Sequence, residues 1–548
     1  MQVGEHVKTV PWYRNGVLYQ IYPLSFADSN GDGYGDIQGI IEHLDYLAGG
    51  EESLGVAAIW LSPMYRSPMK DFGYDISDYR DIDPIFGTMD DFDQLVEEVH
   101  ARGMKLLMDF VPNHSSDQHP WFREAKQSRV SARRDWYIWA NPKADGSPPN
   151  NWLSVFGGSA WTFDKATGQY YLHTFLANQP DLNWRNPKVR AEMEDTLRFW
   201  LRKGVDGFRT DAVAHIFKDA QLRDDPINPD YVEGVWDPAT KYLRKYSSMQ
   251  GDLMILLSEL CDVIDVDDDS MMISEAYLGI EQMKPMYRAC QRHPIHTPFN
   301  FNLMDREWGA SSYAGWIDAY EASLRPQDLP NYVLGNHDKP RIASRVGLER
   351  ARLLAVLQLT LRGLPIIYDG DELGVPNDDV PEPNVRDSWK SLSHGMSLGR
   401  DKDRGPMPWN SEINNGFTTG TPWQPIAPSL HRLAVKSQER DPDSTLNLYR
   451  HLIHLKSSIR ALTFGTYRRL KTDHEDIYAF EREFKTSRCI ILLNFSDSKQ
   501  VVSVEGNESG KLLISTHAVD GSEESGRLGR LTLEPFEGQI YELEGKIK

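Results

Sequence analysis

Ionisable residues recur at the ends of short apolar segments along the first two thirds of the chain. Three carboxylates, two histidines and one arginine form the set, which consists of His114, Arg209, Asp211, Glu275, His337 and Asp338. A single Asp at such a place often caps the next helix. Because residues of this kind follow one segment after another, we expect their side chains to converge on one site.

This set suits the cleavage of a glycosidic bond. A retaining glycosidase needs an ionised carboxylate as nucleophile and a carboxylic acid roughly 5–5.5 Å away that protonates the leaving oxygen. Burial and nearby negative charge raise the pKa of such an acid, and a nearby cation keeps the nucleophile ionised. Arg209 lies two residues before Asp211 on the same predicted strand and therefore on the same face. We expect Arg209 to hold Asp211 in its ionised form.

The elements that must position these residues alternate regularly. Apolar strand-like segments are followed by helix-like stretches, such as "DDFDQLVEEVHARG" (90–103), in which apolar residues fall at helical spacing. Eight such units predict a parallel (β/α)8 barrel, an α/β fold whose catalytic groups project from the carboxyl ends of the strands. The predicted strand segments are 16–23, 56–63, 105–114, 205–213, 269–277, 296–303, 329–338 and 363–374.

Two insertions interrupt the alternation of strands and helices, and near the C-terminus the sequence pattern changes to short alternating strands. Residues 115–183 read as loops and short strands, and a second insertion covers 220–268. After about residue 462, alternating segments such as "RCIILLNFS" predict a small antiparallel β-sandwich. The expected organisation is a barrel interrupted by an inserted domain and followed by the sandwich, with ranges 1–114, 115–183, 184–461 and 462–548.

A short loop near the start has the composition of a cation site. Residues 28–36 read "DSNGDGYGD", with oxygen-bearing groups at every second position. Hard divalent cations require several oxygens around one point, and the position where an EF-hand has a bidentate Glu is Gly39 here. A solvated polar turn is the alternative. The oxygen donors of the predicted site are Asp28, Asn30, Asp32, Tyr34 through its carbonyl, and Asp36.

Composition narrows the class of ligand. The 548 residues include 80 acidic and 60 basic side chains, which give a formal net charge of -20. Nucleic acids and anionic membranes require positive surfaces, so neither is an expected partner. The 15 Trp and 24 Tyr residues supply flat surfaces of the kind that bind sugar rings. A neutral small-molecule ligand fits this composition best, and nothing in it indicates an oligomeric state.

Cysteine usage and the chain's ends suggest a compartment. Cys261, Cys290 and Cys489 are far apart and odd in number, so we predict no disulfide framework. The first 20 residues contain no apolar signal-peptide core, and no apolar run of about 18 residues predicts a membrane span. The expected location is a reducing cytoplasm.

Several motifs together resemble those of α-glucosidases of the α-amylase superfamily, glycoside hydrolase family 13, in the group of maltases and oligo-1,6-glucosidases. They occur in the family's order and spread across the predicted barrel. The matching stretches are "FGYDISDY" (72–79), "DFVPNH" (109–114), "QPDLN" (179–183), "GFRTDAV" (207–213), "SEAY" (274–277), "GNHD" (335–338) and "RGPMPW" (404–409).

The resemblance implies roles for individual residues. Asp211 would be the nucleophile, Glu275 the general acid/base, and Asp338 a non-covalent stabiliser of the transition state. Asp71 and Arg404, with Arg400 as a second choice, would close the far end of the pocket, which implies an exo-acting enzyme. His114 and His337 would hydrogen-bond hydroxyls of the transferred sugar, and Tyr74 would stack on its ring. Phe175 would line the pocket, Phe299 would face the leaving sugar, and Arg209 would hold Asp211. The loop 28–36 would hold a structural Ca²⁺ or Mg²⁺.

The resemblance also bears on linkage. Relatives with Val after the nucleophile tend towards α-1,6 linkages, and those with Ala or Thr towards α-1,4 linkages; this chain has Ala212. We therefore expect hydrolysis of maltose and short oligosaccharides, with transglucosylation as a side reaction. The alternatives are a dedicated glucosyltransferase or sugar isomerase, an α-1,6-specific glucosidase, an endo-acting amylase, and a non-catalytic membrane-associated member of the family.

Overall fold

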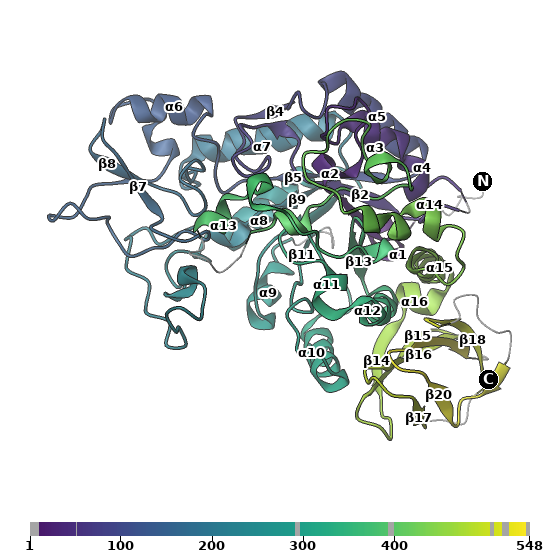
Figure 1. Ribbon diagram of the computed structural model, residues 1–548. Helices are drawn as coiled ribbons and strands as arrows, with labels where there is room; N and C mark the ends of the chain where they lie inside the picture. The colour runs from purple at the N-terminus through teal and green to yellow at the C-terminus, as the bar shows by residue number, and fades with distance from the viewer. Residues whose placement is uncertain are drawn as a thin grey trace, which may run out of the picture.

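A parallel eight-stranded sheet forms the centre of the molecule. The computed structural model describes residues 10–50, 52–290, 296–392, 399–504, 509–517 and 525–543. The strands lie in the order β11-β10-β9-β5-β2-β1-β13-β12 and curve into a barrel (Figure 1). Each predicted strand segment contains one of them, so the predicted barrel is confirmed. The strands are β1 (Leu18–Ile21), β2 (Ala58–Leu61), β5 (Lys105–Phe110), β9 (Gly207–Thr210), β10 (Met271–Ser274), β11 (His296–Pro298), β12 (Asn331–Val333) and β13 (Leu364–Tyr368).

Side chains join the two end strands of this order, β11 and β12. Asn331 Nδ2 donates to Thr297 Oγ1 at 2.8 Å and to the Pro298 carbonyl at 2.6 Å. Thr297 Oγ1 in turn donates to the Leu329 carbonyl at 2.8 Å. These buried bonds satisfy polar groups that would otherwise lie unpaired at the edges of the sheet. They also fix β12, the strand that leads to His337 and Asp338.

Amphipathic helices cover the outside of the barrel. The predicted helix 90–103 is α5 (Met89–Ala101), which begins with a capping box between Thr88 and Asp91 and buries Phe92, Leu95 and Val99. The other helices around the barrel are α3 (Ile37–Glu42), α7 (Pro187–Arg202), α8 (Leu253–Ile264), α9 (Ile280–Met286), α10 (Ala310–Ser323), α11 (Ile342–Val346), α12 (Leu348–Thr360), α15 (Thr445–Ser458) and α16 (Arg460–Phe464).

The inserted segment after β5 forms a lobe beside the barrel mouth, at the left of Figure 1. It contains α6 (Pro120–Gln127), β6 (Trp139–Ala140), β7 (Trp161–Asp164) and β8 (Gln169–Leu172), all within the predicted range 115–183. The second insertion is tied to this lobe. The Asn151 N–H donates to Asp224, the Asn151 side chain exchanges hydrogen bonds with the Asp225 backbone, and Trp152 Nε1 donates to the Arg223 carbonyl.

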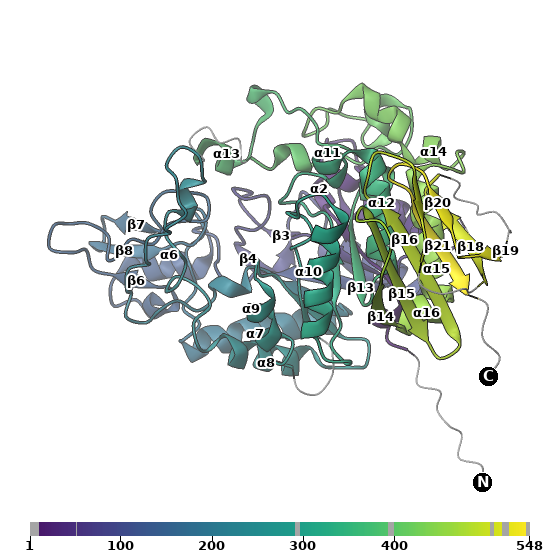
Figure 2. The same cartoon turned by 90° about the horizontal axis from the view of Figure 1, so that it is seen from below.

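An antiparallel sandwich forms the C-terminal part, as predicted. Figure 2 shows it beside α12, α15 and α16, on the side of the barrel away from the inserted lobe. A six-stranded sheet faces the pair β17–β20, with Leu470, Ile490, Leu492 and Leu533 among the apolar residues between them. The strands are β14 (Thr466–Leu470), β15 (Ile477–Phe484), β16 (Ser487–Asn494), β17 (Gln500–Val502), β18 (Ser509–Ser515), β19 (Ser525–Arg527), β20 (Leu531–Leu533) and β21 (Gly538–Leu543).

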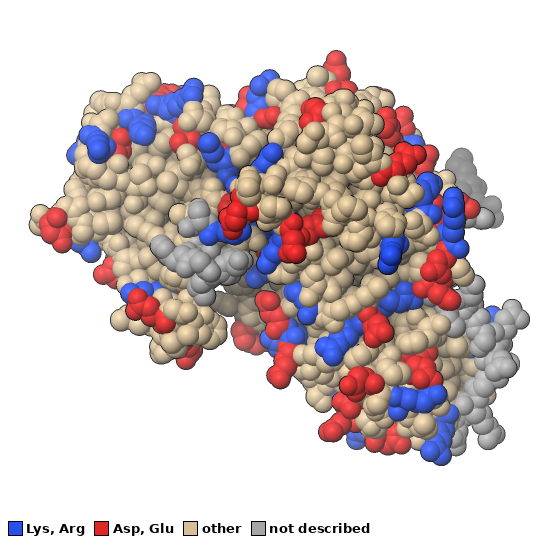
Figure 3. All heavy atoms as spheres, viewed as in Figure 1, with Lys and Arg blue, Asp and Glu red and all other residues tan. Residues whose placement is uncertain are grey.

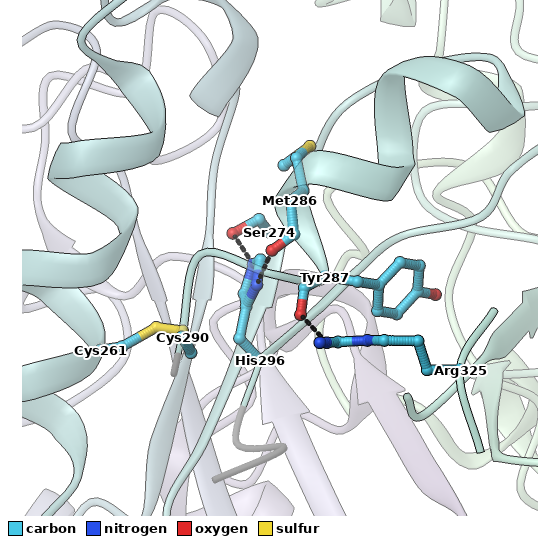
Figure 4. Close-up of a disulfide and its surroundings, with 7 residues drawn as sticks. All are labelled: Cys261, Ser274, Met286, Tyr287, Cys290, His296 and Arg325. Atoms are coloured by element: carbon cyan, nitrogen blue, oxygen red, sulfur yellow. Dashed lines mark hydrogen bonds between the residues drawn. A yellow bond between two sulfur atoms is a disulfide. The ribbon is translucent and has the colours of Figure 1, made fainter. Parts of the chain in front are cut away.

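The structure corrects the prediction about cysteines. Cys261 on α8 and Cys290 after α9 form a disulfide, whereas Cys489 is free and buried (Figure 4). The residues are 29 positions apart in sequence, and consecutive packing of α8, β10 and α9 brings their Cα atoms to 5.9 Å. Sequence spacing alone does not show such a contact. Cysteine usage therefore no longer favours a reducing compartment. In the part of the chain that the structure describes, no helix is long and apolar enough to cross a membrane.

Candidate active site

One buried guanidinium joins carboxylates from three neighbouring strands. Arg209 at the end of β9 donates from Nη1 to Asp211 Oδ1 at 2.7 Å and from Nη1 to Asp109 Oδ1 at 2.7 Å. Its Nη2 donates to Glu275 Oε2, which comes from the end of β10. The Arg209 side chain is only 1% exposed. The predicted contact between Arg209 and Asp211 is present, and the same cation also holds Glu275.

The charge balance of this cluster differs from the expectation. Burial raises the pKa of Asp211 well above its usual range, and Glu275 raises it further, while Arg209 opposes the shift without overcoming it. Burial likewise raises the pKa of Asp109 to about 6 against the influence of Arg209. Three carboxylates share one positive charge in a water-poor site, so the cluster favours keeping a proton. Arg209 thus acts on the pKa of Asp211 in the predicted direction, but burial and Glu275 outweigh it.

The backbone turns sharply after the nucleophile candidate. Ala212 has φ 46° and ψ 35°, a left-handed conformation that residues with a Cβ rarely adopt. In this conformation its N–H donates to Glu275 Oε2 at 3.1 Å. The Ala212 side chain lines the cavity beside Asp211 and Glu275. Local backbone strain of this kind persists where the surrounding contacts demand it.

A second network supports the floor of the site. The Gln20 amide lies 2.7 Å from His337 Nδ1, and His337 Nε2 lies 2.7 Å from the Tyr74 hydroxyl. Tyr74 then donates to Asp109 Oδ2 at 3.0 Å. Tyr74 lines the cavity, whereas His337 is fully buried behind it and its ring stacks on that of Tyr74. The expected direct contact of His337 with the sugar is corrected to a supporting role.

His114 and Asp71 line the cavity, as expected, and Gln179 connects them. Gln179 Nε2 lies 2.9 Å from Asp71 Oδ2 and 3.1 Å from His114 Nε2. Burial lowers the pKa of His114 to about 4, so its imidazole is neutral at ordinary pH. A neutral imidazole and a carboxylate provide both donor and acceptor atoms for hydroxyl groups.

Arg400, and not Arg404, faces the cavity at this end. Arg400 donates to Asp71 at 2.7 Å and to Asp387 at 2.8 Å, and it lies over the rings of Phe156 and Trp389. Arg404 is completely buried and does not line the cavity. The prediction that Arg404 binds the outermost hydroxyls is therefore wrong, because its place is behind the pocket wall.

Asp338 is anchored by both arginines. Arg400 Nη1 and Arg404 Nη2 donate to Asp338 Oδ1 at 3.1 and 2.8 Å. Burial alone would raise the pKa of Asp338, but the neighbouring His337, Arg400 and Arg404 together bring it far below its usual range. Since burial keeps His337 itself neutral, the two guanidinium groups supply the positive charge. Asp338 therefore stays ionised in the cavity.

Of the two aromatic residues predicted to lie at the site, one lines the cavity and the other does not. Phe175 lines the cavity and packs against His114, with ring centroids 5.1 Å apart. Phe299 instead lies in the barrel interior, between Trp60 and Phe301, and is 1% exposed. The expected contact of Phe299 with a leaving sugar is not present.

One cavity of about 660 Å³ contains the site. It reaches beyond the predicted residues to a wall made by the second insertion, which no sequence pattern revealed. Asp387, which fixes Arg400, was also missed, although "DSW" (387–389) begins only eleven positions before "LGRD" (398–401). The additional lining residues include Val155, Phe156, His215, Asp237, Arg244, Lys245, Met249, Tyr277, Lys339 and Trp389.

The loop 28–36 supplies hydrogen-bond partners for its own oxygens. Asp28 accepts from the N–H groups of Asn30, Gly31 and Gly33 and from the Thr418 hydroxyl. Asp36 caps α3 and accepts from Ser29. Among the described residues, no three or more acidic, His or Cys side chains surround one point in a metal-binding arrangement. These hydrogen bonds hold the loop as a self-capped turn with several oxygens in it, and the metal site stays a prediction.

Comparison with known proteins identifies relatives over nearly the whole chain. A family model described as "Alpha amylase, catalytic domain" matches residues 20–465. An oligo-1,6-glucosidase of Parageobacillus thermoglucosidasius is 38% identical over an alignment of 572 positions, gaps included, which covers 97% of this chain and 99% of that protein. An α-glucosidase of Culex pipiens is 38% identical, with 96% of this chain and 90% of that protein covered.

A solved structure described as the α-glucosyl transfer enzyme XgtA has a TM-score of 0.90 and 36% sequence identity, and the match covers 98% of this chain and 100% of that one. The family model, the relatives and the barrel agree with the resemblance of the motifs. The chain belongs to the α-amylase family and is a glycoside hydrolase of the α-glucosidase type.

Proposed function

We propose that the chain is a retaining, exo-acting α-glucosidase that releases terminal α-1,4-linked glucose from maltose and related small α-glucosides. The observation that carries this proposal is the attachment of Asp211 and Glu275 to the two terminal nitrogens of one buried guanidinium, Arg209. Carboxyl groups on adjacent arms of one small cation lie close together. A double displacement requires a short distance between the two carboxyl groups, whereas an inverting mechanism requires space for a water molecule between the base and the sugar.

The first step forms a covalent glucosyl enzyme. The Asp211 carboxylate attacks the anomeric carbon as protonated Glu275 gives its proton to the glycosidic oxygen, which leaves with the aglycone. The Ala212 N–H donates to Glu275 Oε2 and fixes the direction of that carboxyl group. In the second step ionised Glu275 takes a proton from water, the water oxygen attacks the anomeric carbon, and Asp211 is released. Two inversions give α-glucose.

The closed end of the cavity accounts for exo action. Asp71 and Arg400 form an ion pair there, flanked by Phe156 and Trp389. These groups suit the hydroxyls of a terminal glucose, while ionised Asp338 stabilises positive charge that develops on the ring. A chain running through the site would have to displace this buried pair, which costs several kcal/mol.

Two alternatives rest on specific observations. One relative is named an oligo-1,6-glucosidase, which favours an α-1,6 preference, and XgtA is named a glucosyl transfer enzyme. A hydroxyl other than water resolves the same covalent intermediate, so transfer needs no new catalytic group. Product analysis at high maltose discriminates: longer or isomerised sugars with little free glucose indicate a transferase or isomerase.

Covalent trapping tests the mechanism directly. A 5-fluoro-α-glucosyl fluoride forms the glucosyl enzyme at a useful rate and slows its hydrolysis, so we expect the label on Asp211 in peptide mass spectra. Asp211→Asn is expected to lose at least 10³-fold in kcat, because the attacking group is absent. Asp195→Asn, an exposed change on α7, is the matched control. A label on any other residue, or an initial β-anomer of glucose, contradicts the proposal.

The acid limb of the pH profile tests the buried carboxylate cluster. Asp211 attacks only when ionised, and its pKa lies above the ordinary value of 3.8, chiefly because it is buried. Activity is therefore present above this raised pKa and is lost as the pH falls through it. We expect the acid limb of kcat/KM to lie clearly above pH 3.8, in a range where circular dichroism reports the native fold. An acid limb at or below 3.8 contradicts this account.

Replacing Ala212 tests the linkage preference. Ala212→Val places methyl groups near the leaving sugar and is expected to lower the maltose-to-isomaltose ratio of kcat/KM by about 10-fold, since such steric changes are worth about 1–3 kcal/mol. A β-branched residue is strained at φ 46°, so the variant will also be less stable. The ratio corrects for this loss, because both substrates encounter the same folded enzyme. An unchanged ratio rules out Ala212 as the determinant.

The loop 28–36 is proposed as a structural Ca²⁺ or Mg²⁺ site on the chemistry of its oxygen donors. A cation bound only by the folded state raises stability, by about 2.7 kcal/mol at 100 times its dissociation constant. We expect millimolar Ca²⁺ or Mg²⁺ to raise the Tm of protein stripped with EDTA, and Asp32→Ala to abolish the increase. Glu97→Gln, an exposed change on α5, is the control. An equal Tm with and without the cation would show the loop to be a self-capped turn.

A further inference from the structure

The cavity differs in charge between its two halves. At the closed half each cation has acidic partners, since Arg400 contacts Asp71, Asp338 and Asp387. The other half contains Arg244, Lys245 and Lys339, which also line the cavity. Within the described part of the chain, no carboxylate oxygen lies within 4.0 Å of a side-chain nitrogen of these three residues, which is the limit for an ion pair. Unpaired cations are unexpected in a protein with a net charge of -20, whose acidic and basic side chains are mixed over the face drawn in Figure 3.

Chain connections place these cations on the leaving-group side. The Met249 N–H donates to the Ala214 carbonyl at 2.7 Å, which fixes the segment 237–249 against the turn after Asp211. Lys339 follows Asp338 directly, and its Nζ lies 5.5 Å from the ring centroid of Tyr277, two residues after Glu275. The proposed acid Glu275 protonates the leaving oxygen, so residues that extend outward from it meet the aglycone.

Arg244 is the best positioned of the three. Its Nη1 donates to the Leu153 carbonyl at 3.1 Å, which holds the side chain against the inserted lobe. Burial lowers the pKa of Arg244, and Asp225 and Asp237 offset this only in part. Of these two acids Asp237 lines the cavity, and its Oδ1 accepts the Ala239 N–H. A half-buried guanidinium that donates to a backbone carbonyl and has no carboxylate in ion-pair contact among the described residues favours an anionic ligand.

Arg244 also acts on the interior of the site. Burial lowers the pKa of the cavity-lining His215 to about 3, and Arg244 is the next strongest influence in the same direction. His215 packs against Phe175, with ring centroids 5.8 Å apart. The positive field of Arg244 therefore extends to residues around the glucose position. An aglycone bound next to that position lies within its range.

We propose that the aglycone recognised by this enzyme carries an anionic oxygen group, a carboxylate or a phosphate, which Arg244 binds with help from Lys245 and Lys339. This inference rests on the proposed α-glucosidase function and names the chemical class of its leaving group. Charge-assisted hydrogen bonds to a guanidinium are roughly twice as strong as neutral ones. The three cations also offset repulsion between the ligand and the catalytic carboxylates.

Matched glucosides test the proposal. The first pair is 4-carboxyphenyl and 4-carbamoylphenyl α-glucoside, which share shape and differ in charge. The second pair is maltose with and without a phosphate on C6 of its reducing glucose. In the wild-type enzyme we expect the anionic member of at least one pair to have a kcat/KM about 10-fold higher or more, expressed mainly in KM. The pair with the larger preference identifies the anion.

Variants separate this role from a structural one. Arg244→Gln is expected to reduce the anionic-to-neutral ratio of kcat/KM at least 10-fold, and Arg244→Lys to retain part of the preference. Lys241→Gln, an exposed change in the same segment that does not line the cavity, should leave the ratio unchanged. Raising the ionic strength should lower the wild-type ratio, because salt screens partly exposed charges.

The outcomes distinguish the two proposals. Cleavage of the neutral glucosides with a ratio near or below one in both pairs overturns the anionic aglycone and leaves the α-glucosidase function standing. A ratio that Arg244→Gln does not alter overturns the role of Arg244. Failure to cleave any of the four compounds overturns the proposed function and, with it, this inference.

Discussion

The buried guanidinium of Arg209 is the interaction on which the site depends. It reaches carboxylates from β5, from the turn after β9 and from the end of β10, so it fixes three strands of the barrel as well as three charges. Removing one partner of such a buried cluster leaves uncompensated charge and costs about 3–5 kcal/mol. The surrounding barrel must therefore be rigid, and the side-chain bonds between β11 and β12 contribute to that rigidity.

Hydrogen bonds and guanidinium charges also explain how several carboxylates can be buried together in this site. Asp109 receives hydrogen bonds from both Arg209 and Tyr74, and Tyr74 is in turn held by His337. Asp338 has two arginines of its own. The two groups of carboxylates thus experience opposite environments: burial raises the pKa of Asp211 and Asp109, whereas guanidinium charge lowers that of Asp338. The proposed nucleophile Asp211 therefore ionises only at a higher pH than an ordinary Asp, whereas Asp338 ionises at a lower pH.

The barrel and the convergence of the carboxylates on one cavity were predictable because they depend on local patterns. Apolar segments followed by helical periodicity predict βα units, and residues at strand ends meet at the barrel mouth whatever the loops do. The misassigned residues depend on tertiary packing. Arg400 and Arg404 lie four positions apart in one loop, and only the fold decides which of them faces the cavity. Phe299 and His337 were placed correctly along their strands, but one points into the barrel interior and the other lies beneath Tyr74. The Cys261–Cys290 contact arises from helix packing, which has no sequence signal of its own.

The wall of the cavity is a composite of two loops that belong to different strands. Asn151 and Trp152 of the inserted lobe are hydrogen-bonded to residues 223–225 of the second insertion, and Arg244 returns a bond to Leu153. Hydrogen bonds from each loop thus support the other. Substrate selectivity in this scaffold therefore depends on the two loops together. Moving it from one homologue to another requires that both loops be exchanged as a matched set.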